Sequence, residues 1–148
     1  MLPPQSLRTF FVTAVTEQRR RLFQVNRNAE LFLEVLNDQR AKRRMHIHAF
    51  VVMPDHIHLL LTPAADVSLE KSMQYVKGNY SFRLKSGRDV WERGYNEERV
   101  ASRDAYERLS GYIEQNPVRA GLAESAIGFV WSSAGRKATV DPTPAWFA

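Results

Sequence analysis

All four histidines of the 148-residue chain lie within thirteen residues, as the pairs His46/His48 and His56/His58. Each pair reads His-Ile-His in an apolar stretch, and residues two apart on a strand project from the same face, about 6.5–7 Å apart. Two imidazoles at that spacing can bind one cation. Because the chain has no cysteine, any further ligand has to be a carboxylate, an amide or water, a shell that also suits Mg²⁺ or Mn²⁺. The structural alternative is that these are strand histidines hydrogen-bonded to their neighbours.

The turn between the two pairs decides whether they share a face of the sheet. A two-residue turn at Pro54-Asp55 pairs Met53 with His56 and places His46 and His48 on the opposite face. A loop with an odd number of residues reverses this. The sequence leaves both arrangements open.

Tyr112 is the second candidate for chemistry. It lies on a predicted helix whose apolar stripe is formed by Tyr106, Leu109 and Ile113, and it is about 100° off that stripe. Asn116 follows one turn later on the same face. Pro117 disfavours helical geometry at Asn116, so Asn116 is alternatively the end of the helix. In the structural alternative Tyr112 is a half-buried tyrosine whose hydroxyl binds water.

Seven elements are predicted to position these residues. Residues 8–16 are rich in aromatic and β-branched side chains and predict a strand. Helical spacing indicates a helix over 28–41, with Asn26 or Asn28 as its cap. An apolar hairpin over 45–61, a helix from Ser68 to Leu84 and a weaker strand over 90–100 follow. The last helix is capped by Ser102 and has to stop near Pro117.

The resulting order, βαββαβ plus one helix, predicts an α+β protein. The expected architecture is a ferredoxin-like antiparallel sheet with helices on one face and an additional C-terminal helix that carries Tyr112. The hairpin strands are apolar on both sides, so at least one should be central. Residues 122–148 are predicted to be irregular, with Trp131 and Trp146 as anchors.

Composition limits the class of protein. A chain of this length with 44% hydrophobic residues predicts one domain over 1–148, with an irregular tail over about 135–148. The absence of cysteine excludes a disulfide framework and a cysteine nucleophile. No apolar run reaches the roughly 18–20 residues of a membrane span, and the N-terminus lacks a signal-peptide pattern. We therefore expect a soluble cytoplasmic protein, and the net charge of +5 makes nucleic acid a plausible partner.

Together the motifs resemble a known family. Met53-Pro54-Asp55-His56-Ile57-His58 resembles the HUH strand of single-tyrosine transposases. Trp91, followed by Tyr112-Ile113-x-x-Asn116-Pro117-Val118, resembles the nucleophile helix of the same group. The opening Phe-Phe-Val-Thr-Ala-Val-Thr and the later Val130-Trp131-Ser132-Ser133 resemble the subgroup of REP-associated tyrosine transposases. The resemblance spans residues 8–134.

The resemblance implies metal-dependent nicking and rejoining of single-stranded DNA, often beside a hairpin. Tyr112 would be the nucleophile that forms a 5′-phosphotyrosine, and His56 and His58 would hold Mg²⁺ or Mn²⁺. The third ligand would be Asn116, where insertion-sequence relatives commonly carry Gln; Gln115 or water is the alternative. His46 and His48 match no ligand position. The relatives are expected to act as monomers, which favours a monomer over a homodimer here.

Basic residues are candidates for phosphate contacts, several of which are needed together to bind DNA. They occur in two runs and in scattered positions: Arg19, Arg20, Arg21, Lys42, Arg43, Arg44, Lys77, Arg83, Lys85 and Arg93.

Two readings without catalysis remain open beside the enzyme. The first is a ferredoxin-like nucleic-acid-binding module whose histidines are structural. The second is a degenerate transposase that binds hairpins without cutting them.

Overall fold

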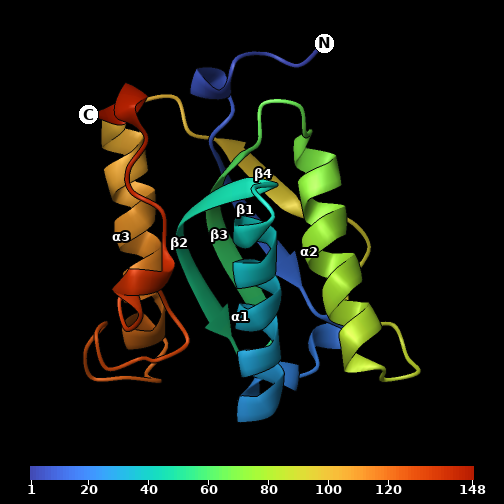
Figure 1. Cartoon of the computed structure of the whole chain (residues 1–148). Coiled ribbons are helices and arrows are strands. Elements are labelled where there is room, and N and C mark those ends of the chain that lie inside the picture. Colours follow the sequence, from blue (N-terminus) through green and yellow to red (C-terminus); the bar gives the residue numbers. More distant parts are fainter.

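A computed structural model describes residues 1–148, except for the side chain of residue 138. Four strands form one antiparallel sheet: β1 (Phe10–Val15), β2 (Met45–Met53), β3 (His56–Pro63) and β4 (Asn96–Arg99). Their spatial order is β2-β3-β1-β4 (Figure 1), which is the ferredoxin-like order. β3 is therefore central, as the apolar hairpin predicted.

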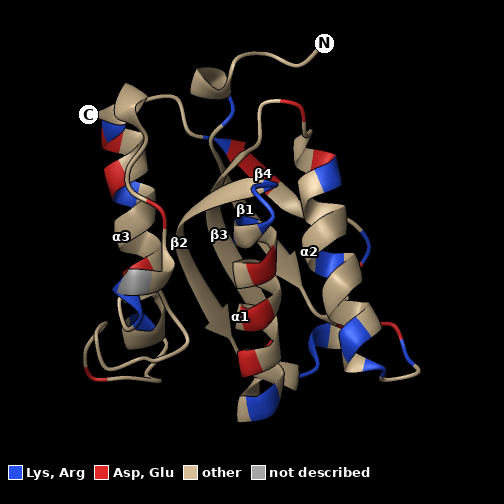
Figure 2. Cartoon of the chain, in the orientation of Figure 1, with Lys and Arg blue, Asp and Glu red and all other residues tan. Residues whose placement is uncertain are grey.

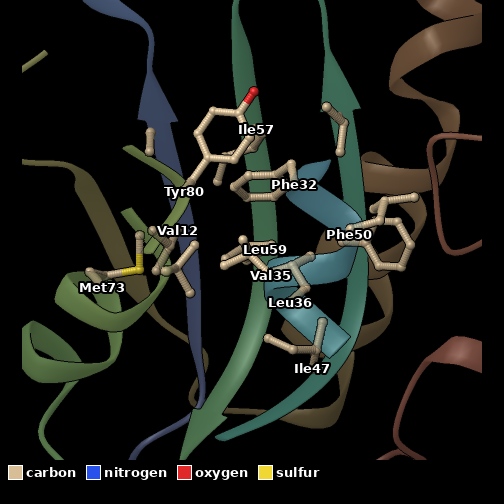
Figure 3. Packing of buried hydrophobic residues seen from close by; sticks show 14 of the residues in the cluster. Val12, Phe32, Val35, Leu36, Ile47, Phe50, Ile57, Leu59, Met73 and Tyr80 are labelled. Atoms are coloured by element: carbon tan, nitrogen blue, oxygen red, sulfur yellow. The ribbon is translucent and has the colours of Figure 1, made fainter. Parts of the chain in front are cut away.

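Two helices cover one face of the sheet. α1 (Asn26–Ala41) and α2 (Leu69–Leu84) lie side by side there in Figure 1. Their apolar stripes meet alternate residues of the strands, with Phe32 and Val35 of α1 and Met73 and Tyr80 of α2 among the buried residues (Figure 3). This larger of two hydrophobic clusters holds the sheet rigid behind the candidate site.

The third helix, α3 (Arg103–Arg119), packs on the opposite face. Tyr106, Leu109 and Ile113 form its buried stripe, as predicted, against Val51 and Leu60 of the hairpin. Because a ferredoxin-like sheet is otherwise bare on this side, α3 turns the fold into three layers and leaves the side chains beside its stripe facing the sheet.

Several predicted boundaries need correction. Neither Asn26 nor Asn28 caps α1; its first turn follows Val25, and the Asn28 amide instead donates to the Leu22 carbonyl. The strand predicted over 90–100 is regular only at Asn96–Arg99, because Gly94 adopts φ 78° and bends the chain.

The last helix ends within two residues of the predicted position near Pro117, but Pro117 does not end it. α3 continues to Arg119 with Pro117 inside it. Proline removes one backbone hydrogen bond, and Pro117 is buried on the packed side of the helix. The helix ends where Gly121 adopts φ 75°, a conformation that glycine reaches without strain.

The segment after α3 has short 3-10 turns, Lys137–Thr139 and Ala145–Phe147, and runs beside β2. The Trp131 carbonyl accepts from the Val52 amide at 2.8 Å, and the Asp141 amide donates to the Ile47 carbonyl at 2.8 Å.

Among the described helices, none combines the length and apolar character that crossing a bilayer requires.

Candidate active site

His56 and His58 open β3 directly after the two-residue turn at Pro54-Asp55. Met53 pairs with His56 and Val51 with His58, so the turn is the even one of the two alternatives. The two imidazole ring centroids are 4.9 Å apart. His58 is buried, whereas the His56 side chain keeps 20% of its surface exposed. The pair therefore converges near the open end of the hairpin.

A second side chain orients each of these rings. The His56 Nδ1 hydrogen bond to the Asp55 carboxylate is 2.7 Å long, and the His58 Nδ1 hydrogen bond to the Thr13 hydroxyl is 2.8 Å long. A carboxylate only accepts, so Nδ1 of His56 carries the proton and Nε2 presents its lone pair. Within the described residues neither Nε2 has a protein partner. This is the arrangement of metal-binding histidines held by outer groups, and the donors fit a divalent cation.

Local electrostatics also favour imidazoles that can bind a cation. Burial, with contributions from His56 and Arg119, lowers the pKa of His58 to about 3. His58 is therefore neutral, as a metal ligand has to be. Burial alone would raise the pKa of Asp55, but hydrogen bonds from His56 and Arg19 outweigh it and keep that pKa below its usual value. Asp55 thus stays ionised beside His56.

Tyr112 comes to the same place from α3. Its ring centroid is 5.7 Å from that of His58 and 5.9 Å from that of Phe11, and Phe11 stacks on His58 at 5.2 Å. The Tyr112 side chain is nevertheless 44% exposed, because it lies beside the buried stripe rather than in it. An accessible hydroxyl next to paired histidines is what a nucleophile for a large substrate requires.

The other tyrosines are less suited to attack. Tyr80 is fully buried in the core. Burial raises the pKa of Tyr106, and burial together with Glu97 and Glu70 raises the pKa of Tyr95. Tyr95 lies near Trp91 and Lys77 in a groove of about 450 Å³ beside α2, so it faces away from His58.

Asn116 lies one helical turn after Tyr112 and is half-buried, while Gln115 is exposed. No hydrogen bond engages the Asn116 amide within the described residues, which leaves it available as a ligand. Carboxylates do not complete the shell, since the described part of the chain has no cluster of three or more His, Cys, Asp or Glu side chains that could hold a metal ion.

His46 and His48 lie at the other end of the hairpin. A bulge between Ile47 and Ala49 shifts the register, so His46 pairs with Thr62 and both histidines turn to the α3 face. Placement on the opposite face, which an even turn alone predicted, is therefore wrong. His48 uses both ring nitrogens, bonding to the Pro142 carbonyl and the Thr62 hydroxyl at 2.9 Å each, which makes it a structural histidine.

The ten basic candidates divide into two sets. Five hold other parts of the protein: Arg19 contacts Asp55, Arg20 the Asp89 carbonyl, Arg44 Gln39 and the Tyr75 ring, Lys77 the carbonyls of Glu92 and Gly94, and Arg83 Asp38. The other five are exposed and form no side-chain hydrogen bond or ion pair with the described residues: Arg21, Lys42, Arg43, Lys85 and Arg93. Figure 2, in which the ribbon is blue at Lys and Arg, shows blue segments on the helices and on several loops.

Sequence reasoning missed Phe11, Thr13 and the role of Asp55. Asp55 precedes His56 directly, and this adjacency is a signal that could have identified it. Thr13 and Phe11 reach His58 only because β1 pairs with β3 in one register. No local sequence pattern predicts this register.

Comparisons with known proteins agree with this geometry. Residues 6–116 match the family described as IS200-like transposases, a span that contains His56, His58 and Tyr112 and ends at Asn116. The chain therefore belongs to the IS200-like transposase family. No curated protein matches it.

Two solved structures share the fold. A REP-associated tyrosine transposase bound to a REP hairpin is 21% identical, with a TM-score of 0.77 over 95% of this chain and 84% of that one. A candidate transposase from Deinococcus radiodurans R1 is also 21% identical, with a TM-score of 0.53 over 72% of this chain and 88% of that one. The first match bears out the resemblance to REP-associated transposases at the level of the fold.

Proposed function

We propose that this protein nicks and rejoins single-stranded DNA through a 5′-phosphotyrosine on Tyr112, at sequences beside a hairpin. The observation that carries the proposal is the 5.7 Å approach of the Tyr112 ring to His58 within one chain. Because one chain supplies both the tyrosine and the histidines, a monomer is sufficient for the reaction. The hairpin is proposed because a relative of the same fold binds one.

His56, His58 and Asn116 are the proposed ligands of one divalent cation, Mg²⁺ or Mn²⁺, with water or Gln115 as the alternative to Asn116. When bound, the cation stabilises negative charge on the phosphate oxygens. Asp55 and Thr13 hold the two imidazoles with Nε2 outward.

Tyr112 performs the transfer. Its phenol oxygen forms a bond to phosphorus as its proton passes to water, the bond from phosphorus to the 3′ oxygen breaks, and that oxygen leaves as a hydroxyl after taking up a proton. The ester conserves the phosphodiester energy, so attack by another 3′-hydroxyl reverses the step and joins the strands without a nucleotide cofactor.

The test is covalent trapping on hairpin DNA with a single-stranded flank, in Mg²⁺ or Mn²⁺. We expect a denaturation-resistant adduct that peptide mapping places on Tyr112. Tyr112→Phe should abolish the adduct and keep hairpin binding, whereas the matched control Tyr95→Phe should form it normally. Joint replacement of His56 and His58 by Ala should also abolish it without unfolding the protein.

Other outcomes would reject the proposal in identifiable ways. Cleavage without an adduct indicates a hydrolytic nuclease. Hairpin binding without cleavage by the wild-type protein indicates the binding module or the degenerate transposase.

A further inference from the structure

Arg119 makes two contacts to Tyr112 that the proposed function does not use. Its guanidinium carbon lies 4.4 Å from the centroid of the Tyr112 ring, and its Nη2 donates to the Tyr112 backbone carbonyl at 2.8 Å. The two residues are seven apart on α3, so Arg119 folds back along nearly two turns of its own helix. Within the described residues the Arg119 side chain forms no ion pair, and its hydrogen bond and its cation–π contact are both to Tyr112.

The Tyr112 ring is thereby held from two directions. Phe11 and His58 meet it in edge-on geometry from the sheet, with interplanar angles of 79° and 69°. Arg119 lies over the ring itself. Tyr112 is 44% exposed, so the packing covers only part of the residue, and a guanidinium over the ring contributes about 0.5–1 kcal/mol at such a site.

We propose that Arg119 is a positioning residue that fixes the Tyr112 side chain against His58. In its absence the phenol would sample rotamers that point into solvent. The part of this inference that concerns catalysis rests on the proposed function, whereas the part that concerns the orientation of Tyr112 does not.

The planar shape of the guanidinium is central to the proposal. Nη2 donates to the carbonyl while the guanidinium carbon lies over the ring, and a lysine ammonium lacks the planar fork that supplies both contacts from one group. Arg119→Lys should therefore behave like Arg119→Gln rather than like wild type. Full rescue by Lys would overturn the positioning role and leave only a role for charge.

The orientation is tested in the free protein, without DNA or metal. Fluorotyrosine incorporated at the five tyrosines gives fluorine NMR signals, and Tyr112→Phe identifies the one from Tyr112. Arg119→Gln should move that signal toward the position of free fluorotyrosine and leave the others in place. The control Arg103→Gln removes an equal charge from the same helix, where Arg103 forms an ion pair with Glu107, and should leave all the signals unchanged. An unchanged Tyr112 signal in Arg119→Gln would overturn the proposal.

Catalysis provides the second measurement. Under single-turnover conditions, Arg119→Gln should slow adduct formation by about tenfold to a hundredfold, the cost of a misplaced reacting group, while Kd for the hairpin stays within about twofold. A rise in Kd as large as the loss of rate would overturn the proposal, because Arg119 would then act by binding DNA. If the wild-type protein forms no adduct, the proposed function fails and the NMR result still decides the orientation.

Discussion

At the residue scale, the candidate site depends on pairs in which one side chain orients another. His56 is held by Asp55, His58 by Thr13, and Tyr112 by Arg119. None of the three partners is a proposed metal ligand or the proposed nucleophile. The orienting partners therefore offer a way to weaken the site without removing any ligand or nucleophile.

Thr13→Val should weaken Mn²⁺ binding by about tenfold, because loss of an outer hydrogen bond lets the ligand ring reorient. Valine has the shape of threonine, so β1 should remain intact. Calorimetric titration of the free protein with Mn²⁺ measures the effect. Thr9→Val is the matched control, since the Thr9 hydroxyl bonds to the Thr62 hydroxyl and not to His58 among the described residues. Equal affinity in the Thr13 variant and wild type would show that Thr13 does not orient His58.

The sequence was informative at this scale wherever the signal was local. Spacing along a strand marks both histidine pairs as candidates, and the position beside a helical stripe marks Tyr112; the choice of His56 and His58 as ligands and of Tyr112 as nucleophile comes from the resemblance to single-tyrosine transposases. Thr13 and Arg119 were not identified, since their roles depend on the pairing of β1 with β3 and on a side chain folding back along α3.

At the element scale, periodicity predicted the order of strands and helices and the buried stripes, and it missed irregularities. The bulge at His48 adds one residue to β2 and reverses which face His46 occupies. Nothing in Met45–Ala49 marks it, because the bulge is held by partners from distant segments, Thr62 and Pro142. The prediction that Pro117 ends α3 fails for a similar reason. Pro117 lies inside the helix and is buried against the rest of the protein, and the local sequence does not reveal that burial.

The start of α3 was predicted and allows a test of how firmly that helix is anchored. The Ser102 hydroxyl accepts from the Ala105 amide at 3.1 Å. Ser102→Ala should lower the free energy of unfolding by about 1 kcal/mol, because that amide loses its acceptor. Urea denaturation measures the change. Ser102→Asp keeps an acceptor and should retain nearly all the stability; an equal loss in both variants would mean that the cap contributes nothing.

At the scale of the whole molecule, two buried histidines make folding sensitive to acid. Burial lowers the pKa of His48 to about 4 and contributes most to lowering that of His58 to about 3. An unperturbed histidine has a pKa of 6.5. Between pH 6.5 and the lowered pKa values, these two histidines therefore bind protons in the unfolded chain but not in the folded chain. Stability is therefore complete above about pH 6.5 and falls as the pH is lowered.

When the pH falls from 7 to 5, each of these histidines should lower the free energy of unfolding by about 2 kcal/mol. Urea denaturation at the two pH values, in metal-free buffer, measures the loss. His48→Gln should reduce the difference between the two pH values. A pH dependence identical in the His48 variant and wild type would contradict the assignment.

The segment that runs beside β2 has a consequence for the behaviour of the chain in concentrated solution. β2 is an edge strand, it is almost wholly apolar, and its outward amides and carbonyls are taken by Trp131, Ser133 and Asp141. An uncovered edge of this kind is a template for pairing with strands of other molecules. By occupying those groups, the C-terminal segment prevents other strands from pairing with this nine-residue edge strand. A chain cut before Trp131 would leave the edge of β2 exposed and should aggregate more readily.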